Sequence, residues 1–192
     1  NKIVIAYQDD SDSDRSKAIV GTVSGTSISF GSAALVDSAT TNQTRQVATY
    51  DSANNRVVVA YSDVTNNKGK VAVGTVSGTD ITFGTPVEFF SAETQYIALT
   101  YDSTNEKVVF AWRQAGSSPY AGKAVVGTVS GTSISFGTTV DFEAGATQQI
   151  GATYDSTNGK VVIAYMDDDD NDYGKAIVGT VSGTSISFGT PV

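Results

Sequence analysis

The aspartates are the residues with the clearest capacity for chemistry, and they gather in two short stretches. Four lie between residues 9 and 14, and five between residues 167 and 172. In both stretches every second residue is acidic, as at the start of oxygen-ligand calcium loops. The EF-hand pattern needs Gly at the sixth position, where this chain has Arg15 and Tyr173, so neither stretch is an EF-hand. The pattern leaves two interpretations open, a calcium site and a solvated acidic loop. The candidate metal ligands are Asp10, Asp12, Asp14, Asp168, Asp170 and Asp172.

A second candidate site is aromatic and basic. Trp112 is the only tryptophan, Arg113 follows it, and Tyr120 lies a few residues further on. An aromatic platform beside a guanidinium stacks on and hydrogen-bonds a sugar, so these three residues form a candidate carbohydrate-binding site. The alternative is that Trp112 is a core aromatic, because the other copies of its motif have Tyr at the same position.

The remaining candidates for catalysis are weak. Asp51, Asp102 and Asp155 recur in the fixed segment DS(T/A)N, where an Asp bonds its own downstream backbone and holds a turn. The chain has no Cys and no His, and the absence of His removes the commonest general base, the commonest transition-metal ligand and any Ser–His pair. We therefore expect no catalytic residues and predict that the protein is not an enzyme.

Charge narrows the class of partner. The formal net charge is −8 and the sequence pI is about 4.3. Nucleic acid and anionic membrane surfaces are poor partners for such a chain, because both need clustered Lys and Arg. No apolar run approaches the length of a membrane-spanning helix.

Two sequence motifs repeat along the whole chain. The run GTVSGTSISFG begins at Gly21, Gly127 and Gly179, and appears as GTVSGTDITFG at Gly74. A second run reads YDSANNRVVVAY, YDSTNEKVVFAW and YDSTNGKVVIAY, and the chain opens inside a copy of it. The copies are about 53 residues apart, a period typical of repeat architectures.

Each copy predicts four short strands. In the third copy they are 95–102, 107–113, 122–130 and a short strand in which Ile134 and Phe136 alternate with Ser. Four strands in about 53 residues are typical of a propeller blade. We predict one all-β domain over residues 1–192, a four-bladed β-propeller of about 15 strands. The repeats cover residues 1–42, 43–93, 94–146 and 147–192, and the first lacks its innermost strand.

The same pattern predicts the core. The second strand of each unit is apolar on both faces, and the outer strand is apolar on one face. The sheet of one unit must therefore be covered by the sheets of neighbouring units. In a closed ring the first and last units are neighbours, which would bring the two acidic stretches together. The residues expected to be largely buried are Val58, Val59, Val108, Val109, Val162, Ile163, Phe83, Phe136 and Phe188.

The motifs YDSTN, KVVIAY and GTVSGTSISFG resemble the repeats of predicted proteins from marine phages and marine bacteria, and the resemblance covers the whole chain. It implies a β-propeller on a virion or cell surface. It implies no catalytic or binding residues that carry over to this sequence.

Differences among the copies point to function. The turns DSTN and SGTS hardly change, whereas the other two connections of each unit differ in length and composition. In an up-and-down meander these variable connections emerge at one end, which favours a binding surface on loops over neutral drift. The sequence therefore predicts a non-catalytic binding or scaffold module whose ligand is a glycan or a surface protein. The alternative is a structural propeller that serves in assembly. Its missing strand then comes either from absent sequence or from another chain that associates through the incomplete first unit.

Overall fold

The protein is all-β in the part of the chain that the structure describes. The computed structural model covers residues 2–192, apart from the side chains of residues 42–45. Within this range the only helical element is a single 3-10 turn, η1 (Asp10–Asp12). None of the described helical structure is long and apolar enough to cross a membrane.

The strands form four antiparallel groups that follow the sequence repeats, and we name these groups units 1 to 4. Unit 1 contains β1 (Lys2–Asp9), β2 (Arg15–Ser24), β3 (Ser27–Phe30) and the first part of β4 (Ala34–Asp51). Unit 2 contains the rest of β4, β5 (Arg56–Asp63), β6 (Lys68–Ser77), β7 (Asp80–Phe83) and β8 (Val87–Phe90). Unit 3 contains β9 (Thr94–Asp102), β10 (Lys107–Gln114), β11 (Ala121–Ser130), β12 (Ser133–Phe136) and the first part of β13 (Val140–Asp155). Unit 4 contains the rest of β13, β14 (Lys160–Asp167), β15 (Tyr173–Ser182) and β16 (Ser185–Phe188).

Local chemistry accounts for the strands and their turns. The second strands, such as β5 and β10, are runs of Val, Ala and aromatic residues, which favour a pleated surface. The third and outer strands are joined by two-residue turns whose Gly has a positive φ, for example 63° at Gly78. The outer strand is broken in the middle, so β7 and β8 pair with opposite halves of β6. This break explains why the described chain has 16 strands where about 15 were expected.

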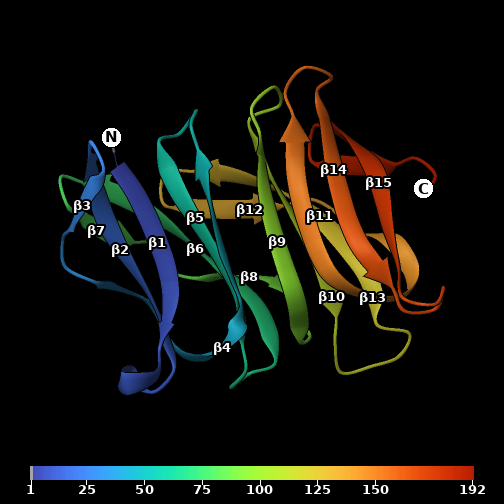
Figure 1. Cartoon of the computed structure of the whole chain (residues 1–192), viewed down its shortest axis with the longest axis horizontal. Helices are drawn as coiled ribbons and strands as arrows, with labels where there is room; N and C mark the ends of the chain where they lie inside the picture. Colours follow the sequence, from blue (N-terminus) through green and yellow to red (C-terminus); the bar gives the residue numbers. More distant parts are fainter. Residues whose placement is uncertain (1) are drawn as a thin grey trace.

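The units are layers packed in a row (Figure 1). β4 leaves the outer edge of unit 1 to become the inner strand of unit 2, and β13 joins units 3 and 4 in the same way. These two long strands merge the four layers into two eight-stranded antiparallel sheets. Unit 1 lies at one end of the row and unit 4 at the other (Figure 1).

Three hydrophobic clusters fill the spaces between successive layers. Val59 and Tyr61 lie between units 1 and 2, Phe110 and Trp112 between units 2 and 3, and Ile163 between units 3 and 4. Neighbouring residues of one strand enter different clusters, as the period-2 geometry of a strand requires. Stacking therefore buries both faces of the two middle units.

The closed ring that the sequence suggested is not seen. In the described part of the chain, the strands of unit 1 pack against unit 2 and make no substantial contact with unit 4. Val162, expected in the core, is only half-buried because it lies on the outer face of unit 4. Phe83, Phe136 and Phe188 are also half-buried, because they end the short outer strands at the margin of each layer. The other Val and Ile residues expected in the core are fully buried.

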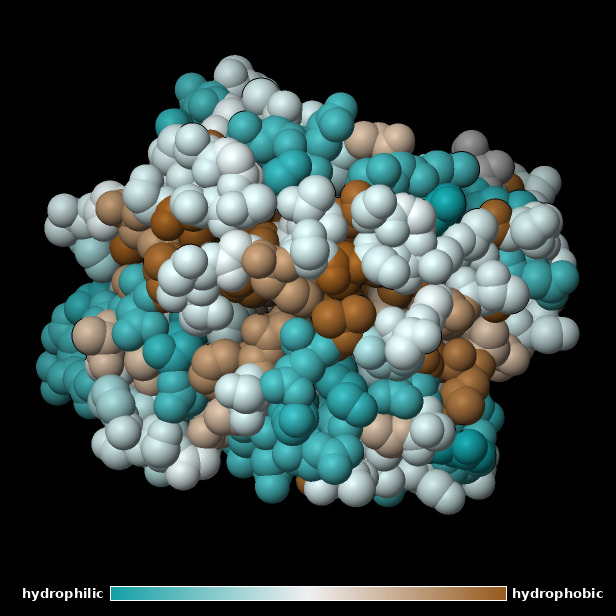
Figure 2. Space-filling view, turned by 180° about the vertical axis from the view of Figure 1, so that it is seen from behind, coloured by the Kyte–Doolittle hydropathy of each residue, from teal (hydrophilic) through white to brown (hydrophobic). Residues whose placement is uncertain are grey.

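Two further features of the surface follow from this arrangement. β1 is the edge strand of its sheet, so unit 1 has no inner strand, as the sequence predicted. Seen from behind, apolar side chains form a broken band across the middle of the molecule, between hydrophilic margins (Figure 2). The margins contain the turns at one end of the strands and the loops at the other (Figure 1).

Candidate functional site

The variable connections do gather at one end of the molecule. The loops after β1, β10 and β14 lie at the lower end in Figure 1, and the tight turns after β9 and β13 lie at the upper end. Backbone hydrogen bonds tie each variable loop to the connection entering its unit. Ala115 N donates to Glu93 O at 2.8 Å, and Asp168 N donates to Ala146 O at 3.0 Å. We call this end the variable end.

The recurring turn aspartates do not belong to this end. Asp51 accepts hydrogen bonds from the backbone N and side-chain amide of Asn54, at 3.0 and 2.9 Å. Asp102 and Asp155 accept the equivalent bonds from their own turns. These bonds confirm the turn role predicted from the fixed motif.

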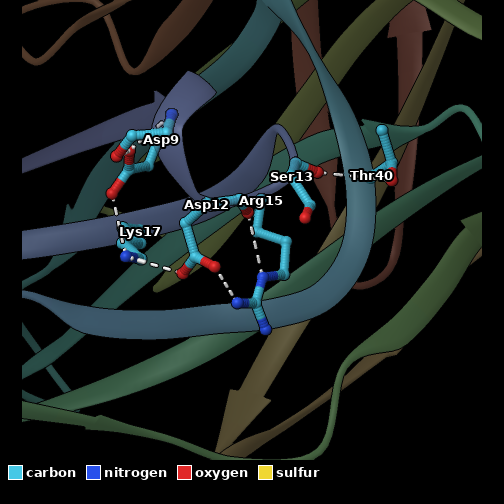
Figure 3. Close-up of polar contacts among 7 residues, drawn as sticks. Asp9, Asp12, Ser13, Arg15, Lys17 and Thr40 are labelled. Atoms are coloured by element: carbon cyan, nitrogen blue, oxygen red, sulfur yellow. Dashed lines mark hydrogen bonds and ion pairs between the residues drawn. The ribbon is translucent and has the colours of Figure 1, made fainter.

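Two basic side chains form ion pairs with aspartates of the acidic loop of unit 1 (Figure 3). Lys17 Nζ lies 2.8 Å from an Asp9 carboxylate oxygen and 2.7 Å from one of Asp12. Arg15 pairs with the other Asp12 oxygen. The hydrogen bonds from Lys17 and Ser11 hold the pKa of Asp9 below its usual range. The carboxylates of Asp9 and Asp12 are thus directed at basic side chains.

The acidic loop of unit 4 follows the same pattern. Lys175 Nζ lies 2.7 Å from Asp167 and 2.9 Å from Asp170, and these two bonds raise its pKa. Asp168 accepts a hydrogen bond of 2.6 Å from Gln148 Nε2. Among the described residues, no three acidic side chains are placed to hold a metal ion.

These contacts bear on the calcium interpretation, because Asp12, Asp168 and Asp170 already have other partners. Asp10 and Asp12 lie in η1, Asp14 precedes β2, and Asp168, Asp170 and Asp172 lie in the loop after β14. Because units 1 and 4 occupy opposite ends of the row, the two loops are not neighbours, contrary to the expectation from a closed ring. Lys17 and Lys175 lie on the third strand of units 1 and 4, and each supplies one positive charge to the acidic loop of its unit.

The three candidate sugar-binding residues separate into core and surface. Trp112 is fully buried and packs on Phe89 and Phe90, with ring centroids 5.1 Å away in each case. It belongs to the core between units 2 and 3, so the expectation that it forms a binding platform is wrong. Its neighbour Arg113 points the other way, because adjacent strand residues face opposite sides.

Arg113 and Tyr120 are brought together at the variable end. The Arg113 guanidinium lies 4.6 Å from the centroid of the Tyr120 ring and 5.8 Å from that of Tyr96. Tyr120 is 38% exposed, whereas Arg113 and Tyr96 are half-buried. The Tyr96 hydroxyl lies 3.1 Å from Gln148 Oε1, which adds an amide to the group. We call these four residues the Arg113 cluster.

Tyr96 and Gln148 were missed by sequence reasoning. Tyr96 has a φ of 49° at the point where the pairing of β9 with β10 shifts register between Ala111 and Arg113. This bulge turns Tyr96 towards Arg113 and has no marker in the sequence. Gln148 comes from unit 4, through an approach that depends on the stacking of layers.

A recurring buried group lies just below the variable end. The Tyr61 hydroxyl lies 2.7 Å from Asp37 Oδ2, and Lys70 Nζ lies 3.3 Å from the same oxygen and 2.8 Å from Asp63. Tyr165 bonds Glu143 at 2.9 Å in the equivalent place. Burial and the adjacent carboxylate raise the pKa of both tyrosines. In unit 3 Trp112 replaces the tyrosine. Phe90, at the end of β8 in unit 2, occupies the position that Asp37 has in unit 1 and Glu143 has in unit 3.

Comparison with models of known protein families gives no match, and comparison with curated protein sequences gives none either. The geometry described above is therefore the basis for any assignment.

Proposed function

We propose that the protein is a non-catalytic binding module, in which a repeated β scaffold presents a variable end to a carbohydrate ligand. The observation that carries this proposal is the grouping of the variable loops at one end, beside constant turns at the other. Loops on a rigid scaffold are where proteins commonly place binding residues.

The Arg113 cluster is the part of the variable end best suited to a sugar. An exposed tyrosine ring offers a flat apolar face for the C–H face of a pyranose, and Arg113 offers several hydrogen-bond donors. Both residues come from unit 3, whose loop between β10 and β11 has no acidic residue. An acidic glycan therefore meets no carboxylate from that loop.

The proposal also concerns the architecture. Each unit is a meander packed face to face with the next, which supports a role as a propeller-type blade. The exposed faces of units 1 and 4 count against a closed four-bladed ring of one chain. The resemblance to phage and bacterial repeats supports a place on a virion or cell surface.

A glycan array followed by calorimetry tests the binding role. The Tyr120→Ala and Arg113→Met variants should lose at least tenfold in affinity for any glycan bound by the native protein. Tyr50→Ala, at the constant end, is the control, because Tyr50 is 52% exposed and its hydroxyl bonds Asn55 in the constant turn after β4. A blank array, or binding that survives both cluster variants, would remove the assignment of this site.

A further inference from the structure

Each internal interface of the row joins two different faces. Unit 3 presents large side chains to unit 2, among them Phe110, Trp112 and Ile134. It presents small ones to unit 4, among them Ala111, Ala124 and Val126. The outer segments β8 and β13 add one large side chain to each of these smaller faces, Phe89 in unit 2 and Phe142 in unit 3. The interface is thus heterologous, because the face of one unit that carries the outer-strand isoleucine covers the opposite face of the unit before it.

One face of each kind remains uncovered at the ends of the row. The first face belongs to unit 1 and consists of Ile3 (39% exposed), Ile5 (40%), Val23 (40%), Ile28 (41%) and Phe30 (48%). The last face belongs to unit 4 and consists of Val162, Ala164, Ala176 and Val178, of which Val178 is 48% exposed. Their equivalents inside the row are covered: Ile81 is 3% exposed, and Val73 and Val126 are 1% and 0% exposed.

A close approach between a glycine of one unit and a threonine of the next unit repeats at each internal interface. A methyl group built on Gly31 would overlap the carbonyl oxygen of Thr79 in the next unit. Gly84 meets Thr132, and Gly137 meets Thr184, in the same way. At Gly189 of unit 4 the nearest atom to such a methyl is the Val178 carbonyl oxygen, 3.8 Å away in its own unit. The matching residue, Thr26, is in unit 1 at the other end of the row.

We propose that the first face of one molecule binds the last face of a second copy of this chain. Two features of the internal interface then recur between molecules: the outer-strand isoleucine, here Ile28, covers the opposite face of another unit, and Gly189 lies against Thr26. The exposed apolar residues at both ends would be covered by the surfaces that cover their equivalents inside the row. Repetition of one heterologous contact produces either a closed ring or a filament.

The experiment uses variants that block one face each. Phe30→Asp places a charge on the first face, and Val178→Asp places one on the last face. Sedimentation equilibrium should show that the native protein grows beyond its 19.9 kDa monomer as concentration rises. Each variant alone should remain a monomer, and an equimolar mixture should form a one-to-one dimer that grows no further. Thr65→Asp, in an exposed loop of unit 2, is the control and should associate like the native protein.

A more conservative change provides an independent readout. Gly189→Val adds a Cβ that makes only an ordinary van der Waals contact within its own layer, 3.8 Å from the Val178 carbonyl oxygen, but it fills the notch that Thr26 would occupy. It should weaken association at least tenfold with an unchanged circular dichroism spectrum.

Three results would overturn the proposal. The first is a native protein that stays monomeric through the high micromolar range. The second is self-association of either blocked variant alone, which would indicate that like faces meet. The third is a mixture of the two variants that remains monomeric.

Discussion

The same isoleucine occurs at one position in all four units, and it provides a controlled test of the layered structure. Ile81, Ile134 and Ile186 are 3%, 6% and 5% exposed, whereas Ile28 is 41% exposed. All four lie in a short outer strand with nearly the same local sequence. Mutation of each to Ala therefore changes the same atoms in the same backbone setting, and only the covering layer differs.

The expected costs follow from burial. Replacing a buried Ile by Ala costs about 2–5 kcal/mol, because transfer free energy is lost and a cavity remains. Ile28 lacks about two-fifths of the transfer contribution, and solvent fills the space left by its side chain, so Ile28→Ala should cost about 1 kcal/mol. The three buried positions should thus each lose about 1–4 kcal/mol more than Ile28.

Urea unfolding followed by far-ultraviolet circular dichroism measures these differences, at concentrations where sedimentation shows a monomer. If Ile28→Ala in the monomer costs as much as Ile81→Ala, the first face is covered within one chain. That result would refute the open row and restore a closed four-bladed ring.

Three further predictions concern buried polar groups and the layer contact. Tyr61→Phe removes a hydrogen bond to Asp37 and should cost about 1.5–3 kcal/mol in chemical denaturation, whereas Tyr50→Phe, at an exposed site, should cost under about 0.5 kcal/mol. A Tyr61 variant as stable as the native protein would show that this bond contributes nothing. Burial, and after it Asp37, raises the pKa of Tyr61 in the folded state. The contribution of Tyr61 to the free energy of unfolding is therefore complete below about pH 10 and is lost as pH rises further. When each stability curve is normalised to its value at neutral pH, alkaline unfolding should begin at lower pH in the native protein than in Tyr61→Phe. Burial raises the pKa of Asp63, but the bonds from Lys70 and Asn66 outweigh it and lower the pKa overall, so this carboxylate stabilises the fold above about pH 4 and ceases to do so as pH falls. Lys70→Met should move the acid unfolding midpoint upward, and an unchanged midpoint would contradict the ion pair. Gly84→Ala should destabilise the protein because its methyl overlaps Thr132, whereas Gly189→Ala in the monomer should leave the melting temperature unchanged; equal effects would disprove the contact.

Local features of the fold could be predicted from the sequence because local chemistry determines them. The strand positions, the turn role of Asp102 and the absence of an inner strand in unit 1 all follow from the repeat and its motifs. Ring closure could not be predicted in this way. It depends on the angle between successive layers, which is set by contacts such as Gly84 with Thr132 and has no counterpart in strand periodicity.

The candidate site was predictable only where its residues are neighbours in sequence. Arg113 and Tyr120 share one loop region, and they do lie together. Trp112 was placed wrongly because a strand residue adjacent to a surface residue faces the core. The acidic stretches suggested a metal because their sequence spacing does not reveal Lys17 and Lys175, which reach them from the neighbouring strand.

Where units 2 and 3 meet, Trp112 and Phe90 replace the tyrosine and the acid of the other interfaces, and this exchange bears on how the chain avoids misassembly. Chains of near-identical repeats fold through intermediates in which the wrong units can pair. If unit 4 packed against unit 2, the Tyr165 hydroxyl would meet the Phe90 ring and find no acceptor there. This mispairing leaves the Tyr165 hydroxyl unsatisfied, so the exchange disfavours packing of unit 4 against unit 2 during folding.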